Sequence, residues 1–361
     1  MKTYGGLYDR ISAFDNLERA AHAARRGKRT RPDVAAFEFA LERELLQLQS
    51  ELRDQSYRPG EYRQFRIFEP KPRLISRAPF RDRVVHHALC RVIEPLFERS
   101  FSAHSYACRV GKGTHRALDR FQTLAREHRW ALTCDVRKFF PSVDHQVLRE
   151  LLARKLRDQR CLALIDCILA SSPPQEPAAT YFAGDDLFTP HVRRHGLPIG
   201  NLTSQFFANV YLNPLDHFVE RTLHCRAYVR YCDDFVLFSD RAQQLVDWRR
   251  QVASFLAGLR LRLHGGKSVV HRTARGIRFL GFRVFPGRRL LARENVVRFR
   301  RRLRRLQHAF AAGVLGAEEL RASIEGWVAH ASHGDTLALR TAMLTRFVAQ
   351  RDVQLVLGGG S

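Results

Sequence analysis

Apolar residues recur three or four positions apart in several segments of the chain, and the longest of these segments covers residues 33–55. This spacing places the apolar side chains on one face of a helix, and Pro32 favours the first helical turn. The pattern therefore predicts an amphipathic helix over 33–55. The same spacing predicts further helices over residues 82–98, 145–156, 202–221 and 296–310.

Three other segments carry the short apolar and β-branched runs that are typical of strands. Residues 62–76 predict a hairpin that turns at 69–72, and residues 132–136 predict a strand that contains one acidic residue. Residues 228–239 predict two strands that meet at an acidic tip, because two adjacent aspartates interrupt the apolar run. Helices and hairpins in one chain indicate an α+β fold.

Positive charge dominates the composition. The 361 residues include 61 Lys and Arg against 36 Asp and Glu, which gives a net charge of +25 and a pI near 10.8. A field of this size favours a polyanionic partner, with nucleic acid as the first candidate and an anionic membrane surface as the second. No apolar run of about 18 residues and no signal-peptide pattern is present, which argues against membrane insertion or export and for a cytoplasmic location.

The seven cysteines and the terminal residues add little chemistry. No Cys-x-x-Cys spacing occurs, so we expect reduced thiols and no zinc ribbon. Residues 358–361, Gly-Gly-Gly-Ser, are predicted to be a flexible tail or an artificial extension.

The acidic tip at Asp233 and Asp234 is the strongest indication of chemistry. Neighbouring carboxylates repel each other unless a cation lies between them, and a divalent metal ion is the usual solution. Asp135 supplies a third carboxylate, and three carboxylates can hold two Mg²⁺ ions roughly 3.5–4 Å apart for phosphoryl chemistry. Two alternatives stay open, because adjacent aspartates are also common in turns and Asp135 could instead pair with an arginine.

A second aspartate pair, Asp185 and Asp186, lies in an irregular stretch that begins with several prolines and covers residues 172–196. No apolar strands flank this pair, so we interpret it as an ordinary turn.

The last predicted helix has two different faces. Its apolar stripe can pack on the rest of the protein, while its other face carries arginines. Few acidic residues lie nearby to neutralise them, which favours contact with a phosphate backbone over a solvated or membrane-bound face. These arginines are Arg298, Arg301, Arg302 and Arg305.

Between about residues 63 and 285, the motifs resemble those of reverse transcriptases in order and spacing. Tyr231-Cys232-Asp233-Asp234 matches the Tyr-x-Asp-Asp box. Asp135, followed five positions later by Phe140, matches the upstream acidic block. Four further segments are similar to the fingers hairpin, the second block of bacterial reverse transcriptases, the lysine-bearing block and the primer grip: residues 71–75, 105–115, 263–267 and 279–282.

The resemblance implies a right-hand polymerase fold that copies RNA into DNA. Its expected partners are template RNA, a primer or cDNA, and dNTPs, and its expected cofactors are two Mg²⁺ ions, with Mn²⁺ able to replace them. The fingers would come from residues 1–110 and 145–198, the palm from 111–144 and 199–286, and an arginine-rich helical thumb from 287–361.

The resemblance also assigns roles to single residues. Asp135, Asp233 and Asp234 would be catalytic and, together with the Val136 carbonyl, would hold the metal ions. Lys267 would be the catalytic acid that protonates the pyrophosphate. Lys71 and Arg73 would neutralise the triphosphate of the incoming nucleotide, and Phe140 would exclude ribonucleotides by bulk. Arg109, Lys112 and Gly281 would contact nucleic acid, as would the four arginines of the last helix.

One block departs from most reverse transcriptases, which carry Gln-Gly…Ser-Pro at this place. This chain has Ile199-Gly200-Asn201-Leu202-Thr203-Ser204-Gln205, a variant that resembles the reverse transcriptases of diversity-generating retroelements. These bacterial and phage systems rewrite a target gene through error-prone cDNA. The resemblance assigns Ile199, Gly200 and Gln205 to the nucleotide site. Ile199 offers only shape where glutamine could hydrogen-bond the nucleotide, a loss of discrimination on the order of 1–3 kcal/mol.

This narrower resemblance implies cDNA synthesis from a template-repeat RNA with frequent misincorporation opposite adenine. It also implies a small, basic and oligomeric accessory variability protein as partner. Two alternatives remain: a defence-type or other bacterial reverse transcriptase, and a catalytically weak RNA-binding scaffold on the same fold. A scaffold would be expected to lose a metal ligand, so the complete set of three aspartates favours the enzyme.

Overall fold

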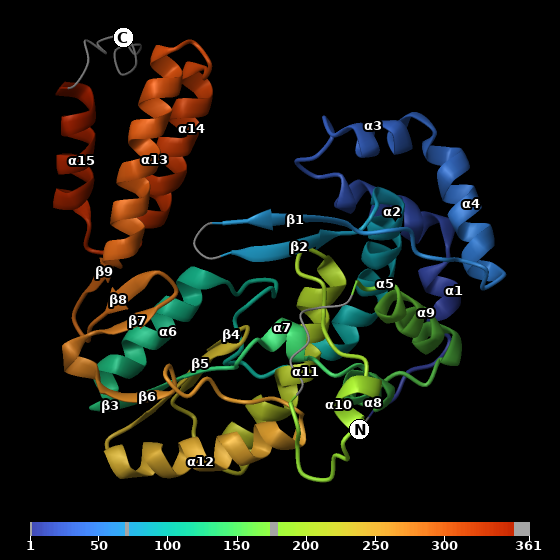
Figure 1. Ribbon diagram of the computed structural model, residues 1–361, viewed down its shortest axis with the longest axis horizontal. Helices are drawn as coiled ribbons and strands as arrows, with labels where there is room; N and C mark the ends of the chain where they lie inside the picture. Colours follow the sequence, from blue (N-terminus) through green and yellow to red (C-terminus); the bar gives the residue numbers. More distant parts are fainter. Residues whose placement is uncertain (1, 69–71, 174–179, 350–361) are drawn as a thin grey trace. The chain divides into compact units, whose positions relative to one another are not determined.

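The computed structural model describes residues 2–68, 72–173 and 180–349 of the chain (Figure 1). Its contacts divide the chain into two compact units, and each unit is assembled from segments far apart in the sequence. The first unit comprises Met1–Arg109, Cys134–Phe235 and Asp247–Ser268, and the second comprises Val110–Thr133, Val236–Val246 and Val269–Ser361.

The first unit is mainly helical. Its long helix α5 (Phe80–Glu98) is buried along most of its length, and α2 (Phe14–Ala24) and α11 (Leu202–Arg221) pack against it. The structure confirms the helices predicted over 82–98 and 202–221. The other helices within this unit are α1 (Tyr8–Ile11), α3 (Pro32–Phe39), α4 (Leu41–Arg53), α7 (Phe139–Ser142), α8 (His145–Ala153), α9 (Gln159–Ala170) and α10 (Thr189–Val192).

Two helix predictions need correction. The helix expected over 33–55 is two helices, α3 and α4, which are separated at Ala40 (φ −113°, ψ 29°). Apolar residues continue on the buried face on both sides of this break, so periodicity alone does not reveal it. The helix expected over 145–156 ends at Ala153, because the chain leaves it to form a bridge between Tyr4 and Leu156.

Three sheets are present in the described ranges. The predicted hairpin is confirmed as antiparallel strands β1 (Arg63–Ile67) and β2 (Arg73–Arg77); residues 69–71 of its turn lie outside the described residues. The central sheet has the order β4-β5-β3-β6, and the third has the order β7-β8-β9. Their strands are β3 (Trp130–Asp135), β4 (Tyr228–Tyr231), β5 (Asp234–Ser239), β6 (Val269–Arg272), β7 (Ile277–Phe279), β8 (Phe282–Val284) and β9 (Arg289–Leu291).

The second unit contains the third sheet and a bundle of C-terminal helices (Figure 1). Helix α13 carries the predicted apolar stripe: Phe299 and Leu303 are buried, and the Phe299 ring stacks on Trp327 with a centroid distance of 4.0 Å. This packing confirms that the apolar face of the helix docks on protein. The helices are α6 (Thr114–Glu127), α13 (Arg293–Ala311), α14 (Ala317–Ala331) and α15 (Leu337–Ala349), with a short 3₁₀ turn at Thr273–Arg275; α12 (Ala242–Gly258) runs from the second unit into the first.

All seven cysteines are free thiols, as predicted. Within the part of the chain that the structure describes, no helix is both long enough and apolar enough to cross a membrane.

Candidate active site

The three aspartates come from two neighbouring strands of the central sheet and the turn beside them. Asp135 is the last residue of β3, and Asp234 is the first residue of β5, which lies next to β3 in the sheet. Asp233 lies in the turn between β4 and β5. Residues almost a hundred positions apart in the sequence thus share one edge of the first unit.

Burial and the charges of neighbouring carboxylates raise the pKa values of two of these acids. Burial raises the pKa of Asp233 above its usual value, the charge of Asp135 adds to the effect, and Arg73 partly opposes it. Packing around the carboxyl, the charges of Asp233 and Asp135 and a hydrogen bond with Asp135 raise the pKa of Asp234, which Lys267 lowers. Because Asp234 remains exposed to solvent, we regard charge repulsion as the main cause for that residue.

Lys267 supplies positive charge at this edge. The segment before it runs beside the Asp135 strand: Val136 forms an antiparallel bridge with Leu263, and the His264 N–H donates to the Asp135 carbonyl at 2.7 Å. This pairing brings the Lys267 ammonium to 2.6 Å from the Asp135 carboxylate. The site therefore favours a cation beside Asp135.

The donors at this edge suit a hard divalent cation, because carboxylate oxygens are the ligands that Mg²⁺ and Mn²⁺ prefer. The Lys267 ammonium already provides one positive charge beside the Asp135 carboxylate. Among the described residues, no group of three or more His, Cys, Asp or Glu side chains is arranged to hold one ion. Asp135, Asp233, Asp234 and the Val136 carbonyl thus remain proposed ligands.

Among the residues expected to bind the nucleotide, Arg73 and Phe140 belong to the first unit, as the acids do. Arg73 begins β2 and is exposed, and its charge reaches Asp233. Phe140 lies on α7 with its ring against buried Phe139, and its carbonyl accepts from the Leu197 N–H at 2.8 Å. Lys71 lies outside the described residues.

The Ile199–Gln205 block contacts the hairpin of β1 and β2. The Ile199 carbonyl accepts a hydrogen bond from the Ser76 N–H of β2 at 2.9 Å. Gly200 has a φ of +119°, and a Cβ there would lie 3.0 Å from the Ile75 side chain, so both the backbone conformation and the close approach require glycine. Gln205 is exposed on the first turn of α11. The structure thus brings Ile199 and Gly200 to the strand that carries Arg73.

Arg109 lies elsewhere than expected. Its guanidinium pairs with Glu98 at 2.6 Å and donates to the Ser105 carbonyl at 2.9 Å, and its side chain is only 6% exposed. These contacts fix the loop that follows α5. The expected contact with nucleic acid is therefore not supported for Arg109, whose sequence context gave no indication of this burial.

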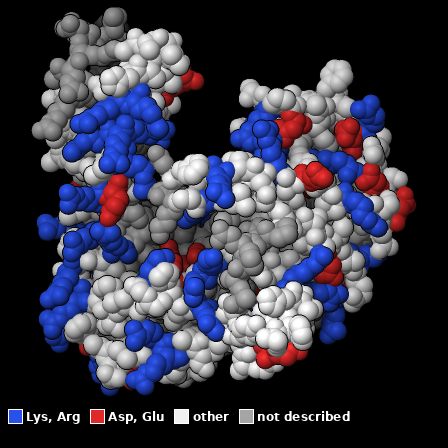
Figure 2. Space-filling model, viewed as in Figure 1, with Lys and Arg blue, Asp and Glu red and all other residues white. Residues whose placement is uncertain are grey.

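The remaining expected contacts with nucleic acid lie in the second unit. Gly281 forms the β7–β8 turn with a φ of +86°, and a Cβ there would lie 2.7 Å from the Asn295 amide. Lys112 lies just before α6 and is half-buried. On α13, Arg301, Arg302 and Arg305 are exposed, whereas Arg298 is half-buried and donates to Asn295. Figure 2 shows blue side chains gathered over this helix.

Arg230, which lies two positions before the turn formed by Cys232 and Asp233, was not predicted as a site residue. Arg230 is completely buried and pairs with Asp216 of α11. The available signal was an arginine inside an apolar strand, since a buried charge needs a specific partner.

A family model described as reverse transcriptase (RNA-dependent DNA polymerase) matches residues 68–284, a range that contains all three aspartates and Lys267. The chain belongs to the reverse transcriptase family. It is therefore an RNA-directed DNA polymerase with the right-hand polymerase fold, in a family that copies an RNA template and generally uses divalent metal ions.

Several known proteins are similar to this reverse transcriptase. Protein YkfC of Escherichia coli is 26% identical over 70% of this chain and 74% of its own length. Group II intron-encoded protein LtrA of Lactococcus lactis is 24% identical over 64% of this chain and 48% of its own length. Among solved structures, telomerase from Candida albicans aligns with 81% of this chain at a TM-score of 0.42 and 13% identity. The reverse transcriptase thus spans about half the length of LtrA.

Proposed function

We propose that this reverse transcriptase makes error-prone cDNA, mutagenic at template adenines, from a template-repeat RNA as part of a diversity-generating retroelement. The observation that carries the proposal is the Ile199–Gln205 block, in which isoleucine replaces glutamine and glutamine replaces proline relative to most of the family. Its backbone contact with β2 supports a place beside the incoming nucleotide, because that strand carries Arg73.

The proposed reaction joins the primer 3′-hydroxyl to the α-phosphate of a dNTP and releases pyrophosphate. Two Mg²⁺ ions, replaceable by Mn²⁺, would supply the charge that activates the hydroxyl and stabilises the leaving group. Asp135, Asp233 and Asp234 provide the carboxylates for them, together with the Val136 carbonyl. The raised pKa values of Asp233 and Asp234 support this role, since a divalent cation would relieve the repulsion.

Basic and aromatic side chains would bind and orient the nucleotide. Arg73 and Lys71 neutralise the triphosphate, and Phe140 occupies the space in which a ribose 2′-hydroxyl would lie. Lys267 gives its proton to the departing pyrophosphate, for which its position beside Asp135 is suitable.

Template RNA would bind mainly through its phosphates, and that interaction carries little sequence information. Template choice therefore requires another source. We assign it to the folded RNA together with a small, basic, oligomeric accessory protein. Because both proteins would be positively charged, RNA or an apolar contact must bridge them.

Replacing the exposed thumb arginines Arg301, Arg302 and Arg305 with glutamine is expected to weaken RNA binding. Each lost phosphate contact should lower the slope of log K against log salt by about 0.7–0.9, so the triple variant should lose roughly two to three units. Dissociation constants measured over a salt series test this. Arg321→Gln on α14 is the control, because Arg321 is exposed and already paired with Glu325 at 2.9 Å. If the triple variant and the wild type have equal slopes, these α13 arginines do not contact RNA phosphates.

Ile199→Gln is expected to reduce misincorporation opposite adenine on the order of tenfold, because the new amide can hydrogen-bond the nucleotide and restore discrimination. Errors opposite the other three bases should change less. Sequencing of cDNA made on one RNA template measures both rates. Ile199→Val keeps an apolar side chain and serves as the control, with an unchanged error spectrum. If the adenine error rate of Ile199→Gln equals that of wild type, the infidelity does not arise at this residue.

A second candidate is a reverse transcriptase that works with a group II intron. The similarity to LtrA, a group II intron-encoded protein that aligns with 64% of this chain, favours it. The same sequencing experiment separates the two functions. Low and uniform errors by the wild-type enzyme would favour the intron-type function over the mutagenic one.

A further inference from the structure

Arg230 lies in the core of the first unit, two residues before the turn formed by Cys232 and Asp233, which we call the catalytic turn. It belongs to β4, and neither Arg230 nor its partner Asp216 has any exposed surface. A charged pair in the interior is costly to desolvate and is often no more stabilising than apolar residues of similar volume. Its presence two residues before the turn therefore calls for a reason other than stability.

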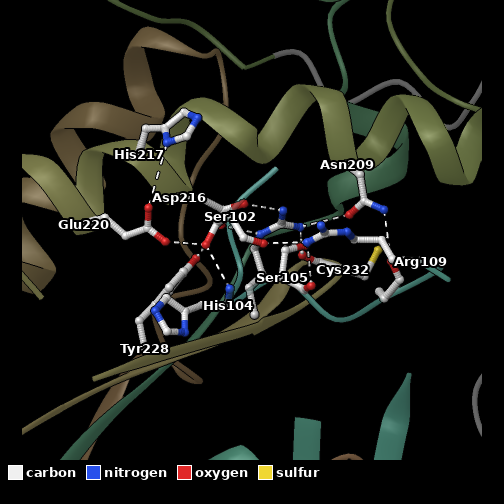
Figure 3. Close-up of polar contacts among 12 residues, drawn as sticks. Ser102, His104, Ser105, Arg109, Asn209, Asp216, His217, Glu220, Tyr228 and Cys232 are labelled. Carbon is white, nitrogen blue, oxygen red and sulfur yellow. Dashed lines mark hydrogen bonds and ion pairs between the residues drawn. The ribbon is translucent and has the colours of Figure 1, made fainter. Parts of the chain in front are cut away.

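The guanidinium is anchored on helix α11. Its Nε donates to Asp216 Oδ1 and its Nη2 donates to Asp216 Oδ2, both at 2.6 Å. Tyr228 Oη donates to the same carboxylate at 2.9 Å, and Figure 3 labels Tyr228 of the strand and Asp216 of the helix. A two-point contact of this kind fixes the plane of the guanidinium. Burial opposes the charge of Arg230, but the adjacent Asp216 outweighs it and raises the pKa of Arg230.

The third nitrogen of Arg230 reaches the catalytic turn. Its Nη1 donates to the Cys232 carbonyl at 3.0 Å and makes a longer contact of 3.3 Å with Asn209. Cys232 has a φ of +58°, in the left-handed region that side-chain-bearing residues rarely adopt. The Cys232 carbonyl and the Asp233 N–H belong to one planar peptide group. The direction of this carbonyl therefore fixes the orientation of the peptide that leads into Asp233.

The backbone of Arg230 is held as firmly as its side chain. Its N–H donates to the His104 carbonyl at 2.8 Å, and its carbonyl accepts from the Tyr106 N–H at 2.9 Å. Arg109 supports this loop, since it donates to the Ser105 carbonyl. These backbone hydrogen bonds therefore fix the position from which the Arg230 side chain extends to the Cys232 carbonyl.

We propose that Arg230 is a positioning residue for the catalytic turn. Anchored on Asp216, it holds the Cys232 carbonyl and so keeps the strained turn in the conformation that presents Asp233 and Asp234 beside Asp135. It touches neither the substrates nor the reacting atoms. Its loss should therefore lower kcat and raise the Mg²⁺ concentration needed for half-maximal activity, while RNA affinity and the KM for dNTP change little.

Two variants of the full chain separate positioning from support of the core. Arg230→Lys keeps the charge next to Asp216, but one ammonium cannot provide the planar fork that also reaches Cys232. The triple variant Asp216→Leu, Tyr228→Phe and Arg230→Met removes the buried ion pair. It also removes the Tyr228 hydroxyl, which would lose its acceptor without Asp216, so the core can stay packed without buried charge. Arg83→Lys is the matched control, because Arg83 is 8% exposed and pairs with Asp33 at 2.9 Å in the same unit without contacting the turn.

For Arg230→Lys and the triple variant we expect kcat to fall on the order of 30-fold, with dNTP KM and RNA Kd within about threefold of wild type, as for a group that acts only on the transition-state geometry. The half-maximal Mg²⁺ concentration should rise in both variants and stay constant in Arg83→Lys. Wild-type kcat and Mg²⁺ dependence in either folded Arg230 variant would overturn the proposal. A parallel loss of kcat in Arg83→Lys at an equal drop in Tm would also overturn it, because the effect would then be general softening of the core.

Discussion

Replacing Asp233 with asparagine is expected to reduce cDNA synthesis by at least about 10³-fold, while RNA affinity stays within about twofold of wild type. The amide has the size of the carboxylate but lacks the charge that would hold a divalent cation at the reacting phosphate. RNA binding depends on cationic surfaces rather than on this acidic edge. Primer extension with dNTPs and Mg²⁺ measures the first quantity, and filter binding of the template measures the second.

The same variant should fold at least as stably as the wild type in the absence of divalent ions. Burial and the Asp135 charge raise the pKa of Asp233, which means that its ionised form is disfavoured in the folded state at neutral pH. Removing that charge should leave the Tm in EDTA equal or higher. Added Mg²⁺ should raise the Tm of the wild type more than that of Asp233→Asn, because the ion stabilises the state that binds it.

The second aspartate pair provides the control for this experiment. Asp186 is exposed and its carboxylate accepts from the Thr189 N–H at 2.7 Å. Its neighbour Asp185 is instead paired with Arg260 at 2.7 Å, so the pair is not the ordinary turn predicted from the sequence. Asp186→Asn should retain synthesis within about threefold, because a surface substitution of this kind has little effect. Synthesis by Asp233→Asn within tenfold of wild type would refute the assignment of this residue.

Replacing Phe140 with alanine is expected to raise ribonucleotide incorporation relative to deoxyribonucleotide incorporation on the order of 10²-fold. The ring would fill the space next to the sugar C2′, and a hydroxyl that meets bulk rather than a partner is rejected sterically. The buried Phe139 ring 5.4 Å away and the hydrogen bond from Leu197 to the Phe140 carbonyl hold this position in place.

The measurement is the ratio of kcat/KM for a dNTP and the matching rNTP in single-nucleotide extension. Phe140→Tyr keeps the bulk of the ring and should preserve the discrimination of wild type. An unchanged ratio in Phe140→Ala would place the sugar selectivity on another residue.

The sequence by itself indicated much of the local structure and the acidic residues that we propose for the site. Apolar spacing predicted α5 and α11 and the stripe of α13, because the side of a helix that faces the core must be apolar. The acidic tip interrupted two apolar strands, and the structure has a turn at that point between β4 and β5. Charge and motif order together indicated a polymerase that acts on nucleic acid.

Only the tertiary structure decided which residues meet. Periodicity reports which face of an element is buried, but not what covers that face. The break at Ala40, the burial of Arg109 against Glu98 and the contact of Ile199 with Ser76 therefore followed from packing alone. Lys267 and Asp135 lie 132 positions apart, and Arg230 reaches Asp216 on another element, so no local pattern contained either pair. The acids were visible in the sequence, while the groups that hold them in place depended on long-range contacts.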